Sequence, residues 1–437
     1  MSDSPLIDSA LLAMFRYRTR GFMRMTECAG AVPPRPRRGG LYLYVHIPFC
    51  EALCPFCSFH RVPHCRPQAA RYFPALRREI ARYADAGYAF SGAYFGGGTP
   101  TIEPGELLET IALVRARFGV REISVETNPR DLRAPLLARL RAAGVTRLSV
   151  GVQSFDDGLL AAMGRLEKYG GGAETAARLR AAAGVLPTLN VDLIFNQPGQ
   201  TPASFARDLD IFRDLGAQQV SCYPLMAAPG RGAPDARRLH QFYGMIAPRL
   251  APAFTPTSAW CFTRAGGATD EYIATADNYV GVGSGAFSYL DGTLYATSFS
   301  LPAYEQRIAQ GATGIVASHA LGETDRMRYA LLVHLFGLSL DRAWAEAQHG
   351  PGFFQRLRGE LLTLELLGAA RRDARGWRLT ARGRYWLMLM MAEFFKSVNA
   401  CRETMRALAA EADRNRRAPR APGPSAPSDI HPVAATG

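Results

Sequence analysis

Three cysteines near the start of the chain have a spacing that suits a metal centre. Cys50, Cys54 and Cys57 form a C-x3-C-x2-C pattern directly after the β-rich run 41–47. Iron–sulfur cubanes are normally held by four thiolates. Three thiolates on one short loop would bind three irons and leave the fourth iron open to a small molecule. The pattern therefore predicts an open [4Fe–4S] cluster.

A zinc site is the alternative interpretation of the same segment. Structural zinc usually takes four protein ligands, and His60, His64 or Cys65 would have to supply the fourth. We favour the iron cluster because C-x3-C-x2-C is not a usual zinc spacing. The other cysteines are spread singly and are expected to be reduced, buried apolar residues.

Strands and helices alternate along the chain, which predicts how the cysteine loop is positioned. Strands are expected at 41–47, 90–95, 122–126, 147–152, 188–195 and 218–225, with helical runs between them. This alternation is typical of βαβ units and a parallel sheet, and six units suit a partial (β/α)6 barrel better than a full eightfold one. Ligands bind such sheets at the carboxyl ends of the strands. The cysteine loop, glycines 96–98, Glu126, Gln153 and Asp192 all fall at or near those ends.

The sequence predicts four regions along the chain. Residues 1–40 end in a Pro-, Arg- and Gly-rich stretch and are expected to form an N-terminal extension and linker. The α/β core with an accessory segment is expected over 41–300, and a mostly helical, winged-helix-like domain over 301–400. Within the latter, an aromatic-rich helix over 384–395 is expected to be buried or to line a substrate gate. Residues 401–437 are expected to form a mostly disordered tail.

Composition and charge argue against several classes of protein. The 437 residues carry a formal net charge of +13, but the basic residues are nearly all Arg and are scattered, as a GC-rich genome would produce. We therefore expect no nucleic-acid partner, whereas a small polyanionic substrate would suit the charge. No apolar stretch is long enough to span a membrane, and the first residues make a poor signal peptide. We expect a cytoplasmic protein without a membrane partner.

Six sequence segments between residues 44 and 289 occur in an order found in one known protein family. They are YVHIPFCEALCPFC, YFGGGTPT, VETNP, LSVGVQSFDD, NVDLIFNQPGQT and GVGSGAFSY. Together they resemble the radical S-adenosylmethionine (SAM) family related to oxygen-independent coproporphyrinogen III oxidase. The resemblance implies that the three cysteines bind a [4Fe–4S] cluster and that SAM chelates its open iron. One electron from the cluster would cleave SAM and release a 5′-deoxyadenosyl radical.

The resemblance also implies a set of SAM-binding residues. Gly97 and Gly98 would let the backbone approach the methionyl group closely. Arg165 would face a carboxylate, and Phe56 would lie against adenine. The full set is Tyr44, Phe56, Gly97, Gly98, Thr99, Glu126, Gln153, Arg165 and Asp192. A reducing partner such as flavodoxin or ferredoxin would supply the electron, and no residue is assigned a catalytic role.

Three functions are compatible with this resemblance. The preferred one is an enzyme of porphyrin or haem metabolism that acts on a tetrapyrrole, similar to coproporphyrinogen III oxidase. The second is a radical methyltransferase that uses two SAM molecules on an sp² carbon. The third is a haem chaperone, in which His60, His64 or Cys65 would bind haem. Phe59 stands where the oxidase carries a fourth cysteine, and 277–279 lack the histidine of the chaperone branch.

Overall fold

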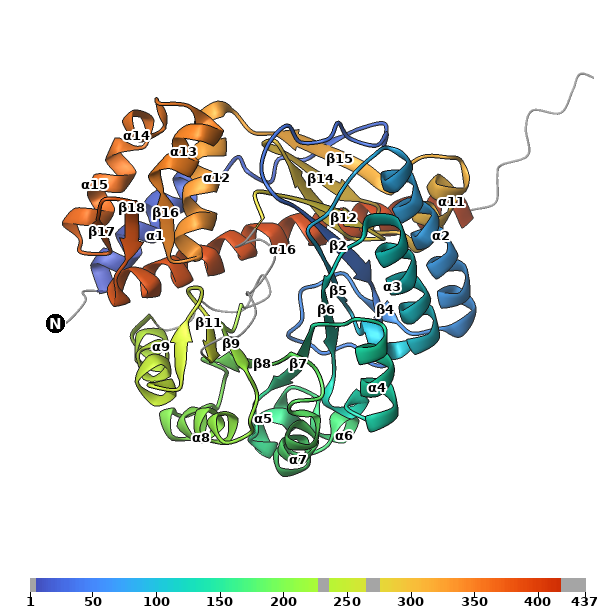
Figure 1. The fold of residues 1–437 in the computed structure, drawn as a ribbon, viewed down its shortest axis with the longest axis horizontal. Helices are drawn as coiled ribbons and strands as arrows, with labels where there is room; N and C mark the ends of the chain where they lie inside the picture. Colours follow the sequence, from blue (N-terminus) through green and yellow to red (C-terminus); the bar gives the residue numbers. More distant parts are fainter. Residues whose placement is uncertain (1–4, 227–235, 265–275, 418–437) are drawn as a thin grey trace, which may run out of the picture.

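A single mixed sheet organises the molecule. The computed structural model describes residues 5–226, 236–264 and 276–417 (Figure 1). The sheet has 13 strands in the order β1-β15-β14-β13-β12-β2-β5-β6-β7-β8-β9-β11-β10. Its centre is parallel and both of its edges are antiparallel. Helices cover the outside of the parallel part.

The parallel centre has the alternation that the sequence predicts. Its strands are β2 (Leu41–Ile47), β5 (Gly92–Gly97), β6 (Glu122–Thr127), β7 (Arg147–Gln153), β8 (Thr188–Phe195) and β9 (Gln219–Pro224). The connecting helices are α2 (Arg66–Asp85), α3 (Pro104–Phe118), α4 (Ala134–Ala142), α5 (Asp157–Ala162), α6 (Leu166–Tyr169), α7 (Gly172–Ala182) and α8 (Pro202–Arg213). Each strand pairs with the next in parallel. The predicted partial (β/α)6 core is confirmed.

The sheet extends further than the sequence predicted. β12 (Asn278–Val282) adds a seventh parallel strand beside β2, where the sequence predicted no strand. The antiparallel strands on this side are β13 (Phe287–Leu290), β14 (Thr293–Thr297), β15 (Ile315–Ala320) and β1 (Thr26–Glu27). β11 (Cys261–Arg264) and β10 (Phe254–Pro256) form the other edge and follow α9 (Ala236–Leu250). Because β15 pairs with β14, the core continues to Ala320 rather than ending at residue 300.

A smaller domain follows the sheet. It contains α12 (Glu323–Phe336), β16 (Ser339–Asp341), α13 (Arg342–His349), α14 (Phe353–Arg356), α15 (Arg358–Leu366), β17 (Ala370–Arg372) and β18 (Gly376–Leu379). β17 and β18 form an antiparallel hairpin, and β16 pairs with the other side of β18. The order of helices followed by a hairpin is the winged-helix-like order that we predicted.

A single long helix, α16 (Ala381–Arg417), crosses the molecule from this domain and ends beside α11 (Leu301–Ala309) (Figure 1). At that end Ser300 Oγ donates a hydrogen bond to Asp413 Oδ1 (2.8 Å). Our prediction of a mostly disordered tail from residue 401 is therefore wrong for residues 401–417. They are helical because Met405 and Ala409 pack against the core and because Ala, Leu, Arg and Glu favour the helix. The rest of the expected tail lies outside the described residues.

Residues 1–40 contain a packed helix besides the expected linker. α1 (Pro5–Thr19) lies against α16, and its buried Asp8 accepts hydrogen bonds from Tyr385 OH (3.1 Å) and Trp386 Nε1 (2.9 Å). Arg16 Nε forms an ion pair with Glu393 at 3.2 Å. The N-terminal extension thus packs against the beginning of α16.

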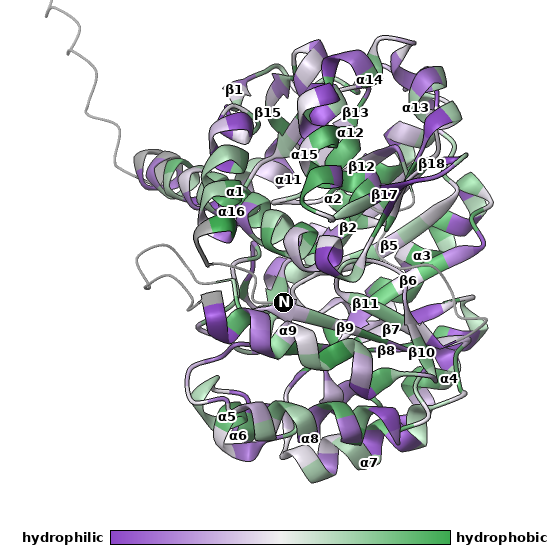
Figure 2. Ribbon diagram, turned by 90° about the vertical axis from the view of Figure 1, so that its left-hand side faces the viewer, coloured by the Kyte–Doolittle hydropathy of each residue, from purple (hydrophilic) through white to green (hydrophobic). Residues whose placement is uncertain are grey.

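Hydropathy follows the layered arrangement. In Figure 2 the outer helices α7 and α8 alternate between hydrophilic and hydrophobic residues, as expected for helices that bury one face against a sheet. β2 is buried along its whole length, because a central strand of a parallel sheet has no exposed face. In the described part of the chain, no helix combines the length and the apolar character that crossing a membrane requires.

Glu79 of α2 connects three segments at one side of the sheet. Its fully buried carboxylate accepts hydrogen bonds from the backbone N–H groups of Gly283 (2.9 Å) and Gly314 (2.6 Å) and from Tyr304 OH (2.7 Å). Gly283 follows β12, Gly314 precedes β15 and Tyr304 belongs to α11. Burial raises the pKa of Glu79, although its hydrogen bonds oppose this shift.

Replacing Glu79 with Leu should lower the free energy of unfolding by about 3 kcal/mol or more, because two buried N–H groups and one hydroxyl lose their acceptor. Denaturant unfolding followed by circular dichroism would measure this. Asp85→Ala on the same helix is the matched control. It should cost less than about 1 kcal/mol, because the ion pair of Asp85 with Arg117 is exposed. An equally small effect of the Glu79 substitution would contradict this role.

Candidate functional site

A cavity of about 340 Å³ lies at the carboxyl ends of the parallel strands. This volume is within the range of about 300–1,000 Å³ that is usual for ligand sites. The cavity is lined by every site residue that we predicted: Tyr44, Cys50, Cys54, Phe56, Cys57, Gly97, Gly98, Thr99, Glu126, Gln153, Arg165 and Asp192. Residues that are up to 148 positions apart in the sequence therefore meet in one place.

The cysteine loop leaves β2 and is held by backbone contacts. The short strand β3 (Phe49–Cys50) pairs with β4 (Val62–Pro63), so the loop returns to its own start. Arg61 closes it by donating hydrogen bonds from Nη2 to the carbonyl oxygens of Cys54 and Cys57 (2.7 Å for the latter). The three thiols are thus presented on a closed loop.

A chain of polar groups connects two of the thiols. Thr99 Oγ1 lies 3.7 Å from Cys50 Sγ and accepts a hydrogen bond from Asn128 Nδ2 (2.8 Å). Arg165 Nη2 donates to Asn128 Oδ1 (3.2 Å), and Arg165 Nη1 lies 3.4 Å from Cys54 Sγ. Asn128 is a site residue that we missed, although it belongs to the VETNP segment.

Glu126 of β6 lies against the glycine run at the end of β5. Its carboxylate accepts hydrogen bonds from the Gly97 N–H (3.0 Å) and from Tyr94 OH (2.9 Å). A Cβ atom at Gly96 would meet this carboxylate at 2.8 Å, and one at Gly97 would meet the His46 ring at 2.6 Å. Gly97 also has φ +115°, which side chains rarely permit. Burial raises the pKa of Glu126.

Gln153 and Asp192 complete the row of polar strand ends. The β7–β8 register shifts between Gly151 and Gln153, and Gln153 has φ 75°. Such an irregularity at a strand end redirects a side chain. Asp192 accepts hydrogen bonds from Ser149 Oγ (3.0 Å) and Asn190 Nδ2 (2.8 Å). Burial raises the pKa of Asp192 to about 7.

Another wall of the cavity is apolar and comes from later parts of the chain. Its largest side chains are Met226, Trp260, Phe287, Met391, Phe394 and Phe395. The last three belong to α16, in the segment that we expected to be buried or to line a gate. The sequence indicated the apolar lining of the cavity only through this aromatic-rich run. The other elements that contribute to the apolar wall lie far from it along the chain.

The residues that could supply a fourth zinc ligand or bind haem lie outside the cavity. His60 is buried, with Nε2 3.2 Å from Ser284 Oγ, and His64 Nε2 is 2.7 Å from Glu103 Oε1. Cys65 is exposed at the start of α2. Within the described ranges no three His, Cys, Asp or Glu side chains are grouped to hold one metal ion, and this includes the three cysteines of the loop. His60, His64 and Cys65 do not line the cavity.

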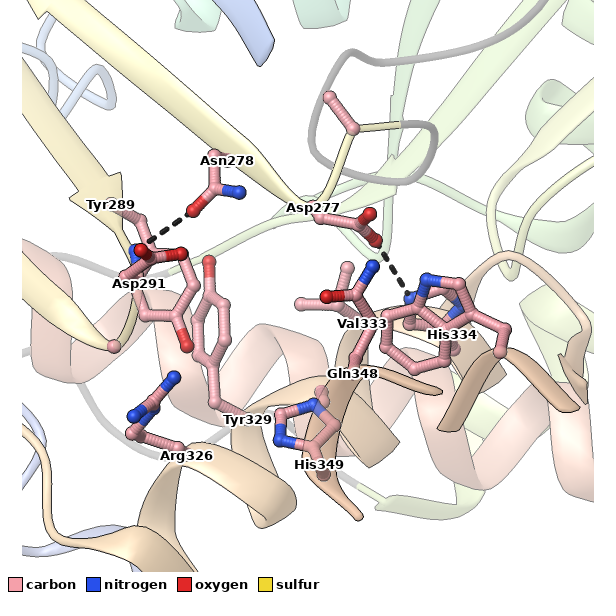
Figure 3. A pocket seen from close by; sticks show the side chains of 14 residues that line it. Asp277, Asn278, Tyr289, Asp291, Arg326, Tyr329, Val333, His334, Gln348 and His349 are labelled. Carbon is pink, nitrogen blue, oxygen red and sulfur yellow. Dashed lines mark hydrogen bonds and ion pairs between the residues drawn. The ribbon is translucent and has the colours of Figure 1, made fainter. Parts of the chain in front are cut away.

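A second pocket, of about 60 Å³, lies at the junction of the sheet and the C-terminal domain (Figure 3). Asp277 Oδ1 is 3.5 Å from His334 Nε2, and Asn278 Oδ1 accepts a hydrogen bond from the Asp291 N–H (2.8 Å). His349 also lines it, and burial lowers the pKa of this histidine to about 4. None of the predicted site residues belongs to this pocket.

The hydrogen-bond partners of His46 determine which of its ring nitrogens carries the proton. Its Nε2 lies 2.8 Å from the His60 carbonyl oxygen, which can only accept, so Nε2 carries the proton. Its Nδ1 therefore accepts from Tyr44 OH (2.9 Å). Burial lowers the pKa of His46 to about 4, so the ring is neutral at pH 7.

The stability of the protein relative to a His46→Gln variant should fall as the pH falls from about 6.5 to about 4. In this pH range His46 binds a proton in the unfolded chain but not in the folded chain. The resulting loss in the free energy of unfolding, relative to the variant, is about 3 kcal/mol at pH 4. Urea unfolding of both proteins at several pH values would measure the difference. A difference that does not vary with pH would show that His46 is not buried in its neutral form.

Comparisons with known proteins agree with this geometry. Residues 44–212 match the model of the radical SAM superfamily. The haem chaperone HemW of Mycobacterium tuberculosis is 31% identical over 322 residues, which are 68% of this chain and 81% of the chaperone. The oxygen-independent coproporphyrinogen III oxidase of Escherichia coli is 28% identical over 403 residues, 83% of this chain and 86% of the oxidase.

The fold agrees as well. The solved structure of coproporphyrinogen III oxidase (HemN) from Escherichia coli, a radical SAM enzyme, superimposes with a TM-score of 0.67 at 26% identity. The superposition covers 85% of this chain and 91% of that structure. The chain therefore belongs to the radical SAM family that includes oxygen-independent coproporphyrinogen III oxidase and the haem chaperone HemW.

Proposed function

We propose that this protein holds a [4Fe–4S] cluster on Cys50, Cys54 and Cys57, binds SAM beside it and uses SAM cleavage to act on a tetrapyrrole. The observation that carries the proposal is the single cavity, which is lined by three thiols, by polar strand ends and by an apolar wall. Each of these three surfaces suits one of the three components.

The residues around the thiols fit an iron–sulfur cluster, which radical SAM proteins use together with SAM. Burial raises the pKa of the Cys50 thiol to about 11, whereas Thr99 and the Arg61 charge oppose this shift. The buried Arg165 guanidinium lies at the Cys54 sulfur, and its Nε has no hydrogen-bond partner among the described residues. The Arg165 guanidinium is a cation beside the thiols with one N–H group still without an acceptor. It therefore suits an anionic cluster and the carboxylate of a ligand bound to that cluster.

The polar strand ends fit SAM, which carries an amine, a carboxylate, a ribose and an adenine. Glu126 and Asp192 offer carboxylate oxygens for the amine or the ribose hydroxyls, and Arg165 offers a guanidinium for the carboxylate. At Gly98 a Cβ atom would meet the Phe49 carbonyl oxygen at 2.6 Å, so only glycine allows this segment to pack directly against the start of the cysteine loop. Phe56, which packs on α5 and lines the cavity, offers a face for adenine.

When bound, the reduced cluster supplies one electron that breaks a sulfur–carbon bond of SAM, giving methionine and a 5′-deoxyadenosyl radical. A flavodoxin or ferredoxin would supply that electron. The chain itself orients SAM through the strand-end groups and excludes water through the aromatic side chains of α16 and Trp260. Exclusion of water protects a reactive intermediate from side reactions.

A tetrapyrrole is the substrate that we favour, because the apolar wall suits a large ring system and because the relatives include oxygen-independent coproporphyrinogen III oxidases. Haem chaperoning is the second candidate, and the match to HemW favours it. Phe59, where the oxidase carries a fourth cysteine, also distinguishes this chain from the oxidase.

Replacing Cys54 with Ser should remove most of the bound iron after anaerobic reconstitution, because one of three ligands is lost. Cys65→Ser, on the exposed cysteine outside the pattern, is the matched control and should keep the iron content of the unmodified protein. Iron and sulfide analysis with electron paramagnetic resonance would measure both. Full cluster content in Cys54→Ser would rule out the assigned ligand set.

Product analysis tests the reaction itself. Reconstituted protein, SAM and a reductant are incubated anaerobically with coproporphyrinogen III, or separately with haem. We expect 5′-deoxyadenosine and loss of carbon dioxide from the porphyrinogen by mass spectrometry. S-adenosylhomocysteine with a methylated product would instead show methyl transfer, and haem retained without SAM turnover would show chaperoning. Either result would overturn a reaction similar to that of coproporphyrinogen III oxidase.

A further inference from the structure

One face of α16 lines the cavity. Met391, Phe394, Val398 and Arg402 recur at spacings of three and four residues, and all four belong to the cavity wall. Residues at these spacings lie on one side of a helix. The cavity-facing side of α16 is therefore apolar from Met391 to Val398 and carries a cation one turn later, at Arg402.

The position of this wall is held at both ends. At the start of α16, Trp386 Nε1 donates to the buried Asp8 of α1 (2.9 Å). Towards its end, Arg406 Nη2 donates to the carbonyl oxygen of Ser58 (2.7 Å), which directly follows the last cysteine of the loop. The hydrogen bond between Ser300 and Asp413 adds a third attachment. Because the wall is already fixed in position, binding of a ligand that fits it does not carry the entropic cost of ordering the helix.

Arg402 has a defined orientation within this wall. Its Nη1 donates to Asn399 Oδ1, one turn earlier on α16 (2.8 Å). Its guanidinium carbon lies 4.8 Å from the centre of the Phe59 ring and 5.7 Å from the centre of the Phe287 ring. A planar guanidinium beside aromatic rings is pre-organised for bidentate hydrogen bonds. Phe59, at the position of the oxidase's fourth cysteine, thus contacts Arg402.

The charge of Arg402 acts on two residues of the strand that leads into the cysteine loop, and one of them, Tyr44, is a candidate SAM-binding residue. Burial is the main cause of the lowered pKa of His46, and the charge of Arg402 adds to it. The same charge opposes the increase in the pKa of Tyr44 that burial causes. Both residues lie on β2, which leads into the cysteine loop, and both line the cavity.

The other two cavity arginines bind the cysteine loop or its neighbours. Arg61 bonds the carbonyl oxygens of Cys54 and Cys57, whereas Arg165 bonds Asn128 and lies at the Cys54 sulfur. Arg402 instead comes from the apolar wall on the last helix.

We propose that Arg402 is a specificity-determining residue, which binds a carboxylate of the substrate and so sets which part of an apolar ring system faces SAM. This inference rests on the proposed function, because it assumes that a tetrapyrrole occupies the cavity. Carboxylate pairing with Arg is strong where water is excluded and two parallel N–H···O bonds can form. The apolar residues of α16 would then contact the ring, and Arg402 would fix its orientation in the cavity.

Binding of two probes that differ only in charge tests the role of Arg402. The reconstituted full chain is titrated anaerobically, without reductant, with coproporphyrin III and with its tetramethyl ester. Arg402→Gln should raise the dissociation constant of the acid about tenfold or more, since a hydrogen bond to a charged group is lost. The ester should bind both proteins within about twofold, because it offers no carboxylate. Arg402→Lys should restore part of the difference, because it keeps the charge but not the bidentate geometry.

Arg414→Gln, on an exposed arginine of the same helix, is the matched control and should bind the acid as the unmodified protein does. Iron content and the spectral response to SAM should be unchanged in Arg402→Gln, which shows that the variant is folded. If that folded variant binds the acid normally, or loses acid and ester equally, the assignment of Arg402 is wrong while the tetrapyrrole proposal stands. If the unmodified protein binds neither probe, the tetrapyrrole proposal fails and the assignment of Arg402 fails with it.

Discussion

The structure depends on the parallel register of its central strands. His46 of β2 lies beside Gly96 of β5, Glu126 of β6 lies beside Ser149 of β7, and Gly151 of β7 lies beside Asp192 of β8. Because the strands are in step, their last residues form one edge of the sheet, and the cavity forms there. A slip by one residue would turn every side chain of a strand to the other face. The positions of the thiols and of the acidic residues thus follow from backbone pairing before any ligand is considered.

Buried polar groups at this edge are arranged so that most satisfy each other. The path from Cys50 through Thr99, Asn128 and Arg165 to Cys54 connects two thiols by short contacts. Such networks make an interior rigid when their members are paired. Burial meanwhile raises the pKa of Glu126 and of Asp192, and the charge of Arg147 opposes both shifts.

The parts that could be predicted from the sequence are those with local signals. The alternation of strands and helices identified the (β/α)6 core, and the cysteine spacing identified the three thiols, because each pattern depends on neighbours in the chain. The set of SAM-binding residues came from the resemblance to a known family. β12 was missed because its short buried run, Val280 to Val282, is interrupted by Gly281 and followed by Gly283, and these glycines suggest a loop. The helical part of the expected tail was missed because an Arg- and Ala-rich composition hides an apolar stripe of only a few residues. Arg402 and Asn128 could not be singled out, since their significance arises from contacts between distant segments.

α16 is the last element of the described chain, yet it supplies the apolar wall of the cavity and touches the cysteine loop at Ser58. During synthesis every strand of the sheet is complete before this helix leaves the ribosome. Until then the cysteine loop lacks its contact with Arg406, and the cavity lacks its apolar wall. Docking of the helix afterwards completes the cavity, so the order of the elements along the chain also sets the order in which the polar and the apolar walls are assembled.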